Sequence, residues 1–98
     1  MPARLIIRRQ GVPDRIVSLN EGPLYTVGRA AEAEVCVPDE PQLGKRHATV
    51  RLSGVVLRVA RLAPEGLLLR DGESLQSFEL AAGGSFAVGY TRFVFEAA

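Results

Sequence analysis

Short apolar or alternating runs, each followed by a turn signal, recur along the whole sequence. The runs cover residues 4–9, 15–19, 25–28, 35–37, 47–52, 55–60, 67–69, 74–80, 85–88 and 91–96. Glycine, proline or asparagine separates most of them, for example at 11–13, 20–23, 53–54 and 83–84. About ten short strands spaced in this way are typical of an antiparallel β-sandwich or barrel. We therefore expect residues 1–98 to form a single all-β domain.

Alternation within the runs predicts which side chains face the core. In residues 47–52 one face is apolar and the other polar: Ala48, Val50 and Leu52 against His47, Thr49 and Arg51. Phe93 and Phe95 share a face in the last run, and Ser53-Gly54 predicts a hairpin between 47–52 and 55–60. Residues 29–34 contain alanine and glutamate, but six residues are too few for a stable helix, so we expect a loop with at most one turn.

Composition excludes several functional classes. The net charge is +1, so electrostatics gives no case for nucleic acid binding. No apolar run approaches the roughly 18–20 residues that span a bilayer, and we expect no membrane insertion. Cys36 is the one cysteine, which rules out an internal disulfide and favours a reducing, cytoplasmic location. Between Val35 and Val37, it is expected to be a buried, inert thiol.

The sequence lacks the residue sets that catalysis or metal binding requires. It has one histidine, His47, and its one cysteine lies eleven residues away, which gives no metal-ligand pattern. No glycine-rich nucleotide loop is present, and no serine or cysteine is tied to His47 by spacing. We therefore expect no enzyme activity, no cofactor and no metal.

Two cationic segments stand out. Gly28-Arg29 closes one run, and Lys45-Arg46-His47 opens another; the chain's one lysine and one histidine both lie in the second segment. If the β-domain brings these segments to one end, their cations would suit a compact anion such as phosphate.

An ordered series of motifs extends over nearly the whole chain: Gly28-Arg29, Gly44-Lys45-Arg46-His47, Glu65-Gly66-Leu67, Asp71-Gly72, Leu80-Ala81-Ala82-Gly83-Gly84, Val88-Gly89 and Phe93-Val94-Phe95. In order and spacing the series resembles the forkhead-associated (FHA) domain, which reads phosphothreonine peptides. The resemblance implies an FHA-like β-sandwich of about ten to eleven mostly antiparallel strands, with recognition loops at one end.

The resemblance also implies roles for the cationic segments. Arg29 matches the arginine that reaches the phosphate, although it would otherwise pair with Glu32 or Glu34. Lys45 replaces the usual arginine, so it keeps the charge without the forked donors, or it is only a solvated surface lysine. Arg46 would add positive charge near the phosphate position, although an arginine at such a position is more often only exposed to solvent. Gly28 and His47 would support the loops, with His47 bracing them through hydrogen bonds.

Three further positions depart from the family pattern. Gly44 replaces a serine whose hydroxyl donates to phosphate; its backbone N–H would still donate, or the glycine only serves the loop conformation. Glu65 replaces an asparagine that binds the peptide backbone, and it would repel phosphate or pair with Arg29 or Lys45. Leu67 replaces the threonine after Gly66, and an exposed leucine there would offer an apolar contact.

These departures favour a non-catalytic protein-interaction module with weak or absent phosphate dependence. The alternative is a working phosphothreonine-peptide reader in kinase signalling that uses Arg29 and Lys45. The expected partner is a protein or a phosphothreonine-containing peptide, such as a serine/threonine-kinase substrate or a component of a secretion system or scaffold.

Overall fold

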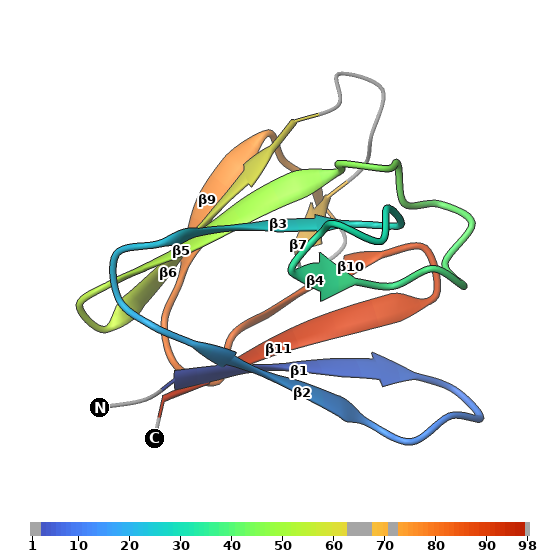
Figure 1. Cartoon of the computed structure of the whole chain (residues 1–98). Helices are drawn as coiled ribbons and strands as arrows, with labels where there is room; N and C mark the ends of the chain where they lie inside the picture. Colours follow the sequence, from blue (N-terminus) through green and yellow to red (C-terminus); the bar gives the residue numbers. More distant parts are fainter. Residues whose placement is uncertain (1–2, 63–67, 71–72, 98) are drawn as a thin grey trace.

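The structure, a computed structural model, describes residues 3–62, 68–70 and 73–97. Within these ranges the chain forms eleven strands and no helix (Figure 1). In chain order the strands are β1 (Ala3–Arg9), β2 (Arg15–Leu19), β3 (Leu24–Gly28), β4 (Val35–Cys36), β5 (Ala48–Ser53), β6 (Val56–Arg61), β7 (Leu69–Arg70), β8 (Glu73–Ser74), β9 (Ser77–Leu80), β10 (Ser85–Val88) and β11 (Thr91–Ala97). None of the described residues belongs to a helix that would span a membrane.

Two sheets face each other. One has six strands in the order β2-β1-β11-β10-β7-β8, and the other has five in the order β4-β3-β5-β6-β9. The strand pairs within these sheets are antiparallel, except that β3 and β4 run parallel. The predicted all-β sandwich of ten to eleven mostly antiparallel strands is therefore confirmed.

The core lies between the sheets and is built from the inward side of the alternating runs. Phe86 packs between Phe78 and Phe93, with ring centroids 5.8 and 4.8 Å apart. Phe93 and Phe95 are both fully buried, so they share the inner face as predicted. On β5, Ala48, Val50 and Leu52 are also buried, whereas Arg51 is exposed.

Three local predictions differ from the structure. Residues 74–80 are not one strand: β8 pairs with β7 in one sheet, and β9 pairs with β6 in the other. The chain changes sheets between them, where Leu75 N–H donates to Leu68 O and Gln76 O accepts from Arg61 N–H. His47 does not face outward with Thr49 and Arg51 but is buried immediately before β5. Cys36 is half-buried rather than buried.

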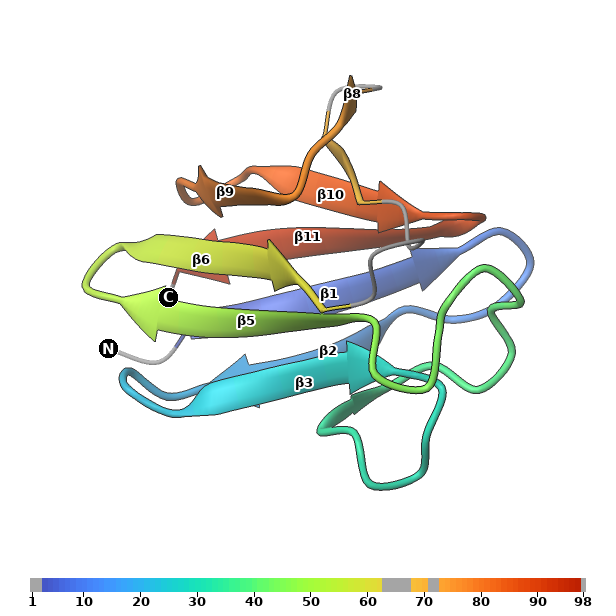
Figure 2. The same ribbon diagram turned by 90° about the horizontal axis from the view of Figure 1, so that it is seen from above.

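The connections divide between two ends of the sandwich (Figure 2). The β5–β6 turn and both chain ends lie at one end in both views. The β3–β4 and β4–β5 loops lie at the other end, together with the β1–β2 and β10–β11 turns. We call this second end the loop end; it carries Arg29 and Lys45.

Candidate functional site

The two cationic segments meet at the end of β3. Beyond the last residue of that strand, Arg29 N–H donates to Gly44 O at 3.0 Å and Ala30 N–H donates to Lys45 O at 3.2 Å. A Cβ on Gly28 would overlap the carbonyl oxygen of Lys45, so only glycine permits this approach. The β3–β4 loop closes in a single turn, with Ala33 N–H donating to Ala30 O, as expected for residues 29–34.

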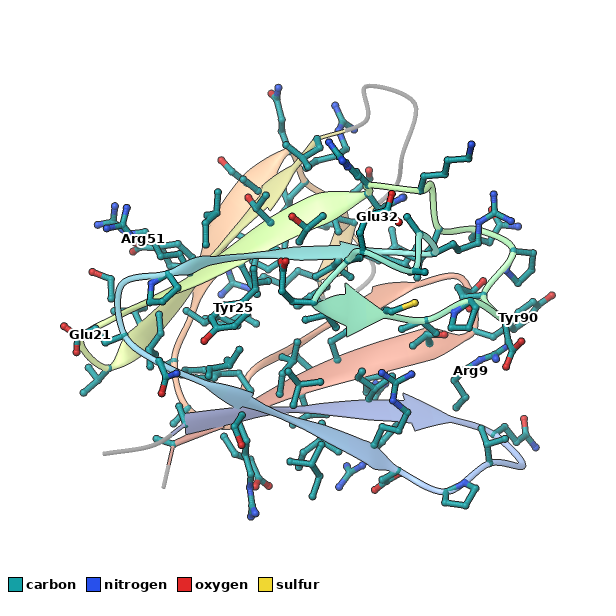
Figure 3. The ribbon with its side chains drawn as sticks, viewed as in Figure 1. Arg9, Glu21, Tyr25, Glu32, Arg51 and Tyr90 are labelled. Carbon is teal, nitrogen blue, oxygen red and sulfur yellow. The ribbon has the colours of Figure 1, made fainter. Side chains whose placement is uncertain are left out.

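A hollow of about 440 Å³ opens where these loops meet, and we call it the cationic hollow. It is lined by Arg29, Ala30, Glu32, Pro38 and Lys45. Arg29 and Lys45 are both exposed, and with Glu32 they give the hollow two positive charges and one negative. Figure 3 shows Glu32 at the loop end, well away from Glu21 and Arg51. The arrangement favours a small anion, and Glu32 weakens that preference.

None of the acids that the structure describes forms an ion pair with Arg29 within 4.0 Å. Glu34, one of the two acids considered as its partner, instead accepts a 2.7 Å hydrogen bond from Thr26 N–H. The guanidinium of Arg29 therefore lines the cationic hollow without an acidic partner among the described residues.

His47 connects the β4–β5 loop to its surroundings through hydrogen bonds. Its Nδ1 accepts a 3.0 Å hydrogen bond from Gly44 N–H, its own N–H donates to Val27 O at 2.8 Å, and its carbonyl accepts from Leu62 N–H at 2.9 Å. The side chain is only 1% exposed. Gly44 has no side-chain donor, and its backbone N–H is already bonded to His47. Gly44 therefore directs no hydrogen-bond donor at an anion.

A second group, Glu40, ties the loop end together and was not identified from the sequence. Its buried carboxylate accepts hydrogen bonds from Gln42 N–H, Tyr90 N–H and the Thr91 hydroxyl, at 3.0, 2.8 and 2.8 Å. Burial by itself raises the pKa of Glu40. The three hydrogen bonds and the charge of Arg9 outweigh burial and leave that pKa below its ordinary value.

The turn that meets Glu40 also requires glycine. Gly89 has a positive φ of 59°, and a Cβ on it would overlap the Glu40 carboxylate. A glutamate in a loop is usually solvated, so sequence reasoning had no local signal for this buried role. In the sequence, Val88-Gly89 stood out only as part of the ordered motifs, and nothing there indicated that Tyr90 bonds to Glu40, fifty residues earlier.

Solved structures with the same arrangement of strands exist. The FHA domain of the CT664 protein from Chlamydia trachomatis matches with a TM-score of 0.89 and 18% identity, covering 100% of this chain and 99% of that chain. The Slr1951 protein from Synechocystis sp. matches with a TM-score of 0.82 and 21% identity, covering 99% and 96%. An FHA domain analysed for phosphothreonine-dependent interactions matches with a TM-score of 0.80 and 22% identity, covering 97% of each chain.

This chain has the FHA fold. The likeness inferred from the ordered motifs is therefore confirmed at the level of structure. No model of a protein family matches the sequence, and no curated protein matches it.

Within the FHA fold, the predicted site residues do not all gather at the hollow. Arg29 and Lys45 line it, and Gly44 lies in the same loop as Lys45. Arg46 is exposed but is not among the lining residues. Glu65, Gly66 and Leu67 lie outside the described residues, as does the Asp71-Gly72 turn, so the expectations for them stay predictions.

Proposed function

We propose that this FHA-fold chain is a non-catalytic protein-interaction module that binds a peptide at its loop end, with weak or absent dependence on phosphate. The observation that carries the proposal is Gly44. This residue offers no hydroxyl, and its N–H donates to His47 instead of pointing to the cationic hollow. An anion in the hollow would therefore rely on Arg29 and Lys45.

The missing donor has a cost in affinity. A hydrogen bond to a charged group contributes roughly 1.5–3 kcal/mol, which corresponds to a factor of about 10 to 100 in affinity. Glu32 lines the same hollow and opposes a doubly charged phosphate more than a singly charged carboxylate. The replacement of an asparagine by Glu65, inferred from the resemblance, acts in the same direction.

A protein or peptide partner agrees with what two similar proteins bind. One similar structure is the FhaA FHA domain complexed with the intracellular domain of Rv3910, and another is EmbR of Mycobacterium tuberculosis in complex with a low affinity phosphopeptide. For this chain we infer a partner of the same chemical kind, such as a kinase substrate or a component of a scaffold or secretion system. A reducing compartment such as the cytoplasm suits the free thiol of Cys36.

The second candidate is a working phosphothreonine reader. It is favoured by the exposed guanidinium of Arg29, which has no acidic partner among the described residues and lies at the hollow with Lys45. An arginine fork and an ammonium together match a phosphate dianion well. The two candidates differ in how much affinity the phosphate contributes.

Titration against matched peptides separates them. Phosphothreonine peptides and the same peptides with threonine would be titrated into wild type, Arg29→Ala and Arg51→Ala. Arg51 is an exposed arginine at the opposite end, so its loss serves as a charge-matched control (Figure 3). We expect phosphate to improve binding by less than about tenfold. Low-micromolar binding that requires phosphate and is lost only in Arg29→Ala would overturn the proposal in favour of the reader.

A further inference from the structure

One long edge of the sandwich has no partner strand. The two sheets end in β2 and β8 and in β4 and β9, and β2 is the longest of these four edge strands, with five residues against two, two and four. Within the described part of the chain, the backbones of residues 15–19 hydrogen-bond to no backbone other than that of β1. Every second residue of such a strand directs its N–H and C=O away from its neighbour, so the outer side of β2 presents unpaired groups.

The usual protections of a sheet edge are missing from β2. Natural edges are commonly blocked by proline, by lysine, by a bulge or by a very short strand. Residues 15–19 contain no proline, glycine or lysine, and Ile16 and Val17 are β-branched, which favours a strand. The one charged side chain crosses to the other sheet, where Arg15 Nη1 donates to Cys36 O of β4 at 2.6 Å. The edge is therefore open to another strand.

An apolar row crosses the outer face of the six-stranded sheet and ends at this edge. Ile16 on β2 lies opposite Ile6 on β1, and Ile6 lies opposite Val94 on β11. None of these three described residues belongs to the core cluster between the sheets. Ile6, inside the row, is only 6% exposed, whereas Ile16, at its end, is 58% exposed. A strand added beyond β2 would cover Ile16 and continue the row.

Charged pairs flank the apolar row on both sides. Arg4 Nε donates to Glu96 at 2.9 Å on one side, and Arg8 Nε donates to Asp14 at 3.1 Å on the other. The edge therefore carries a negative charge at its start, and near its end Ser18 lies opposite the positive Arg4. Such an edge is complementary to an antiparallel copy of itself, whose acid would come to lie beside Ser18 and two strands from Arg4.

Two copies of β2 satisfy this pattern when they pair about a two-fold axis at Ile16. This register places Ile16 beside Ile16 of the second copy and Asp14 beside its Ser18. Directly opposed side chains have Cβ atoms about 4.5–5.5 Å apart, so the two isoleucines would touch. Across the joint the charges of one row then alternate in sign, in the order Glu96, Arg4, and then Asp14 and Arg8 of the second copy. A foreign strand would need the same order of charges, which a second copy supplies by symmetry.

We propose that β2 is a self-association edge, through which two copies of this chain pair antiparallel with Ile16 at the two-fold axis and join their six-stranded sheets into one. The contact is one strand wide, so the dimer is weak and depends on concentration. Because β2 begins at the loop end and runs away from it, antiparallel pairing directs the two loop ends in opposite directions. Both cationic hollows stay open, and the dimer presents them to two separate partners.

Sedimentation over a range of protein concentrations tests the dimer. Wild type is compared with Ile16→Asp, which places a charge at the axis without changing a buried side chain. Val55→Asp is the matched control, because Val55 is 79% exposed in the β5–β6 turn, away from β2. Thermal melting verifies that both variants fold. Titration of all three with one peptide reports separately on the proposed function, since pairing needs no peptide.

Single cysteines test the register. In a Cys36→Ser background, Ile16→Cys places the two thiols opposite each other, whereas Ser18→Cys places them four residues apart along the strands. Four residues correspond to roughly 13 Å, and a disulfide needs Cα atoms within about 7 Å. Mild oxidation should therefore crosslink Ile16→Cys into dimers and leave Ser18→Cys monomeric.

The proposal expects reversible dimers of wild type, a dissociation constant raised at least about tenfold in Ile16→Asp, and no change in Val55→Asp. Wild type that stays monomeric up to about 1 mM overturns it, as does a dimer that Ile16→Asp leaves intact. Equal crosslinking of the two cysteine variants, or faster crosslinking of Ser18→Cys, overturns the register about Ile16. Peptide binding that fails while the dimer forms overturns the proposed function and leaves the β2 edge in place.

Discussion

The buried carboxylate of Glu40 accepts a 2.8 Å hydrogen bond from the hydroxyl of Thr91, although 51 positions separate the two residues in the chain. The same oxygen accepts the N–H of Tyr90. One charged group therefore joins the β4–β5 loop, which carries Lys45, to the β10–β11 turn. We therefore expect the connection between the loop and the turn to weaken when Glu40 is protonated.

Stability should accordingly depend on pH through Glu40. Its hydrogen bonds lower its pKa below the ordinary value of 4.5 in the folded protein, despite burial. A lowered folded-state pKa gives stability that is fully present above the unfolded-state pKa and is lost as the pH falls through the folded-state value. Glu40→Gln should lower the free energy of unfolding by about 1–3 kcal/mol at pH 7. In urea denaturation, the difference from wild type should shrink below pH 4.5.

Glu96→Gln is the control for this experiment. Glu96 accepts a 2.9 Å hydrogen bond from Arg4, but the two side chains are 37% and 52% exposed to solvent, so its loss should change the free energy of unfolding by less than about 1 kcal/mol. Equal losses in the two variants, or a Glu40→Gln difference that stays constant into acid, would contradict the assignment.

Two glycines of the loop end should respond in opposite ways to alanine. A Cβ at Gly28 overlaps the Lys45 carbonyl, whereas a Cβ at Gly44 meets only His47 Nδ1, at 3.8 Å. Gly28→Ala should therefore cost about 3 kcal/mol of unfolding free energy. Gly44→Ala should be neutral or stabilise by up to about 1 kcal/mol through the unfolded chain. Thermal or urea unfolding measures both, and similar stabilities would refute the close approach of the two loops.

His47 should matter for stability rather than for chemistry. Its removal in His47→Ala leaves Gly44 N–H without its acceptor and opens a buried space, so the free energy of unfolding should fall by about 2–4 kcal/mol. Hydrogen exchange should show faster exchange of the Gly44 amide. The exposed neighbour Arg46 provides the control, because Arg46→Ala should change neither quantity. An unchanged Gly44 exchange rate in folded His47→Ala would exclude the bond.

Most strands were predictable because their signal is local. Residues 47–52 alternate polar and apolar side chains, and Phe93 and Phe95 share one face of residues 91–96; burial of alternate side chains in a two-layer sandwich produces such patterns. The prediction for residues 74–80 was wrong because alternation does not record which sheet a segment joins. The crossing there depends on Leu68 and Arg61, whose backbones hydrogen-bond to the intervening residues.

The site was predictable in part for the same reason. Arg29 directly follows β3 and Lys45 lies shortly before β5, and these two strands are antiparallel neighbours, so the sandwich brings the two residues together. Glu40 was missed because two of its three hydrogen-bond partners, Tyr90 and Thr91, lie about fifty residues away, and nothing in its neighbourhood distinguishes it from a solvated loop acid. The alternating pattern did not predict the burial of His47, because this side chain bonds to Gly44 in the β4–β5 loop, which lies outside the strand.

Removing the acid from the cationic hollow should strengthen anion binding. Glu32 lines the hollow with Arg29 and Lys45, and its charge opposes a bound anion. Glu32→Gln should tighten phosphothreonine-peptide binding by about 0.5–1 kcal/mol at low salt, with less gain at high salt. Glu21→Gln, an exposed acid at the opposite end, should give no gain (Figure 3). Isothermal titration at two salt concentrations measures both, and an equal gain in the two variants would indicate only a net-charge effect.

Restoring the missing hydroxyl is the most direct test of why phosphate dependence should be weak. Gly44 has no positive φ, and a Cβ there makes only ordinary contact with His47, so serine fits without strain. Gly44→Ser should tighten binding of a phosphothreonine peptide about tenfold, because it adds a hydrogen bond to a charged group. It should leave the unphosphorylated peptide unchanged, and Gly44→Ala should gain nothing for either peptide. If folded Gly44→Ser binds phosphate no better than Gly44→Ala, residue 44 does not face the anion, and the correspondence with the FHA serine is wrong.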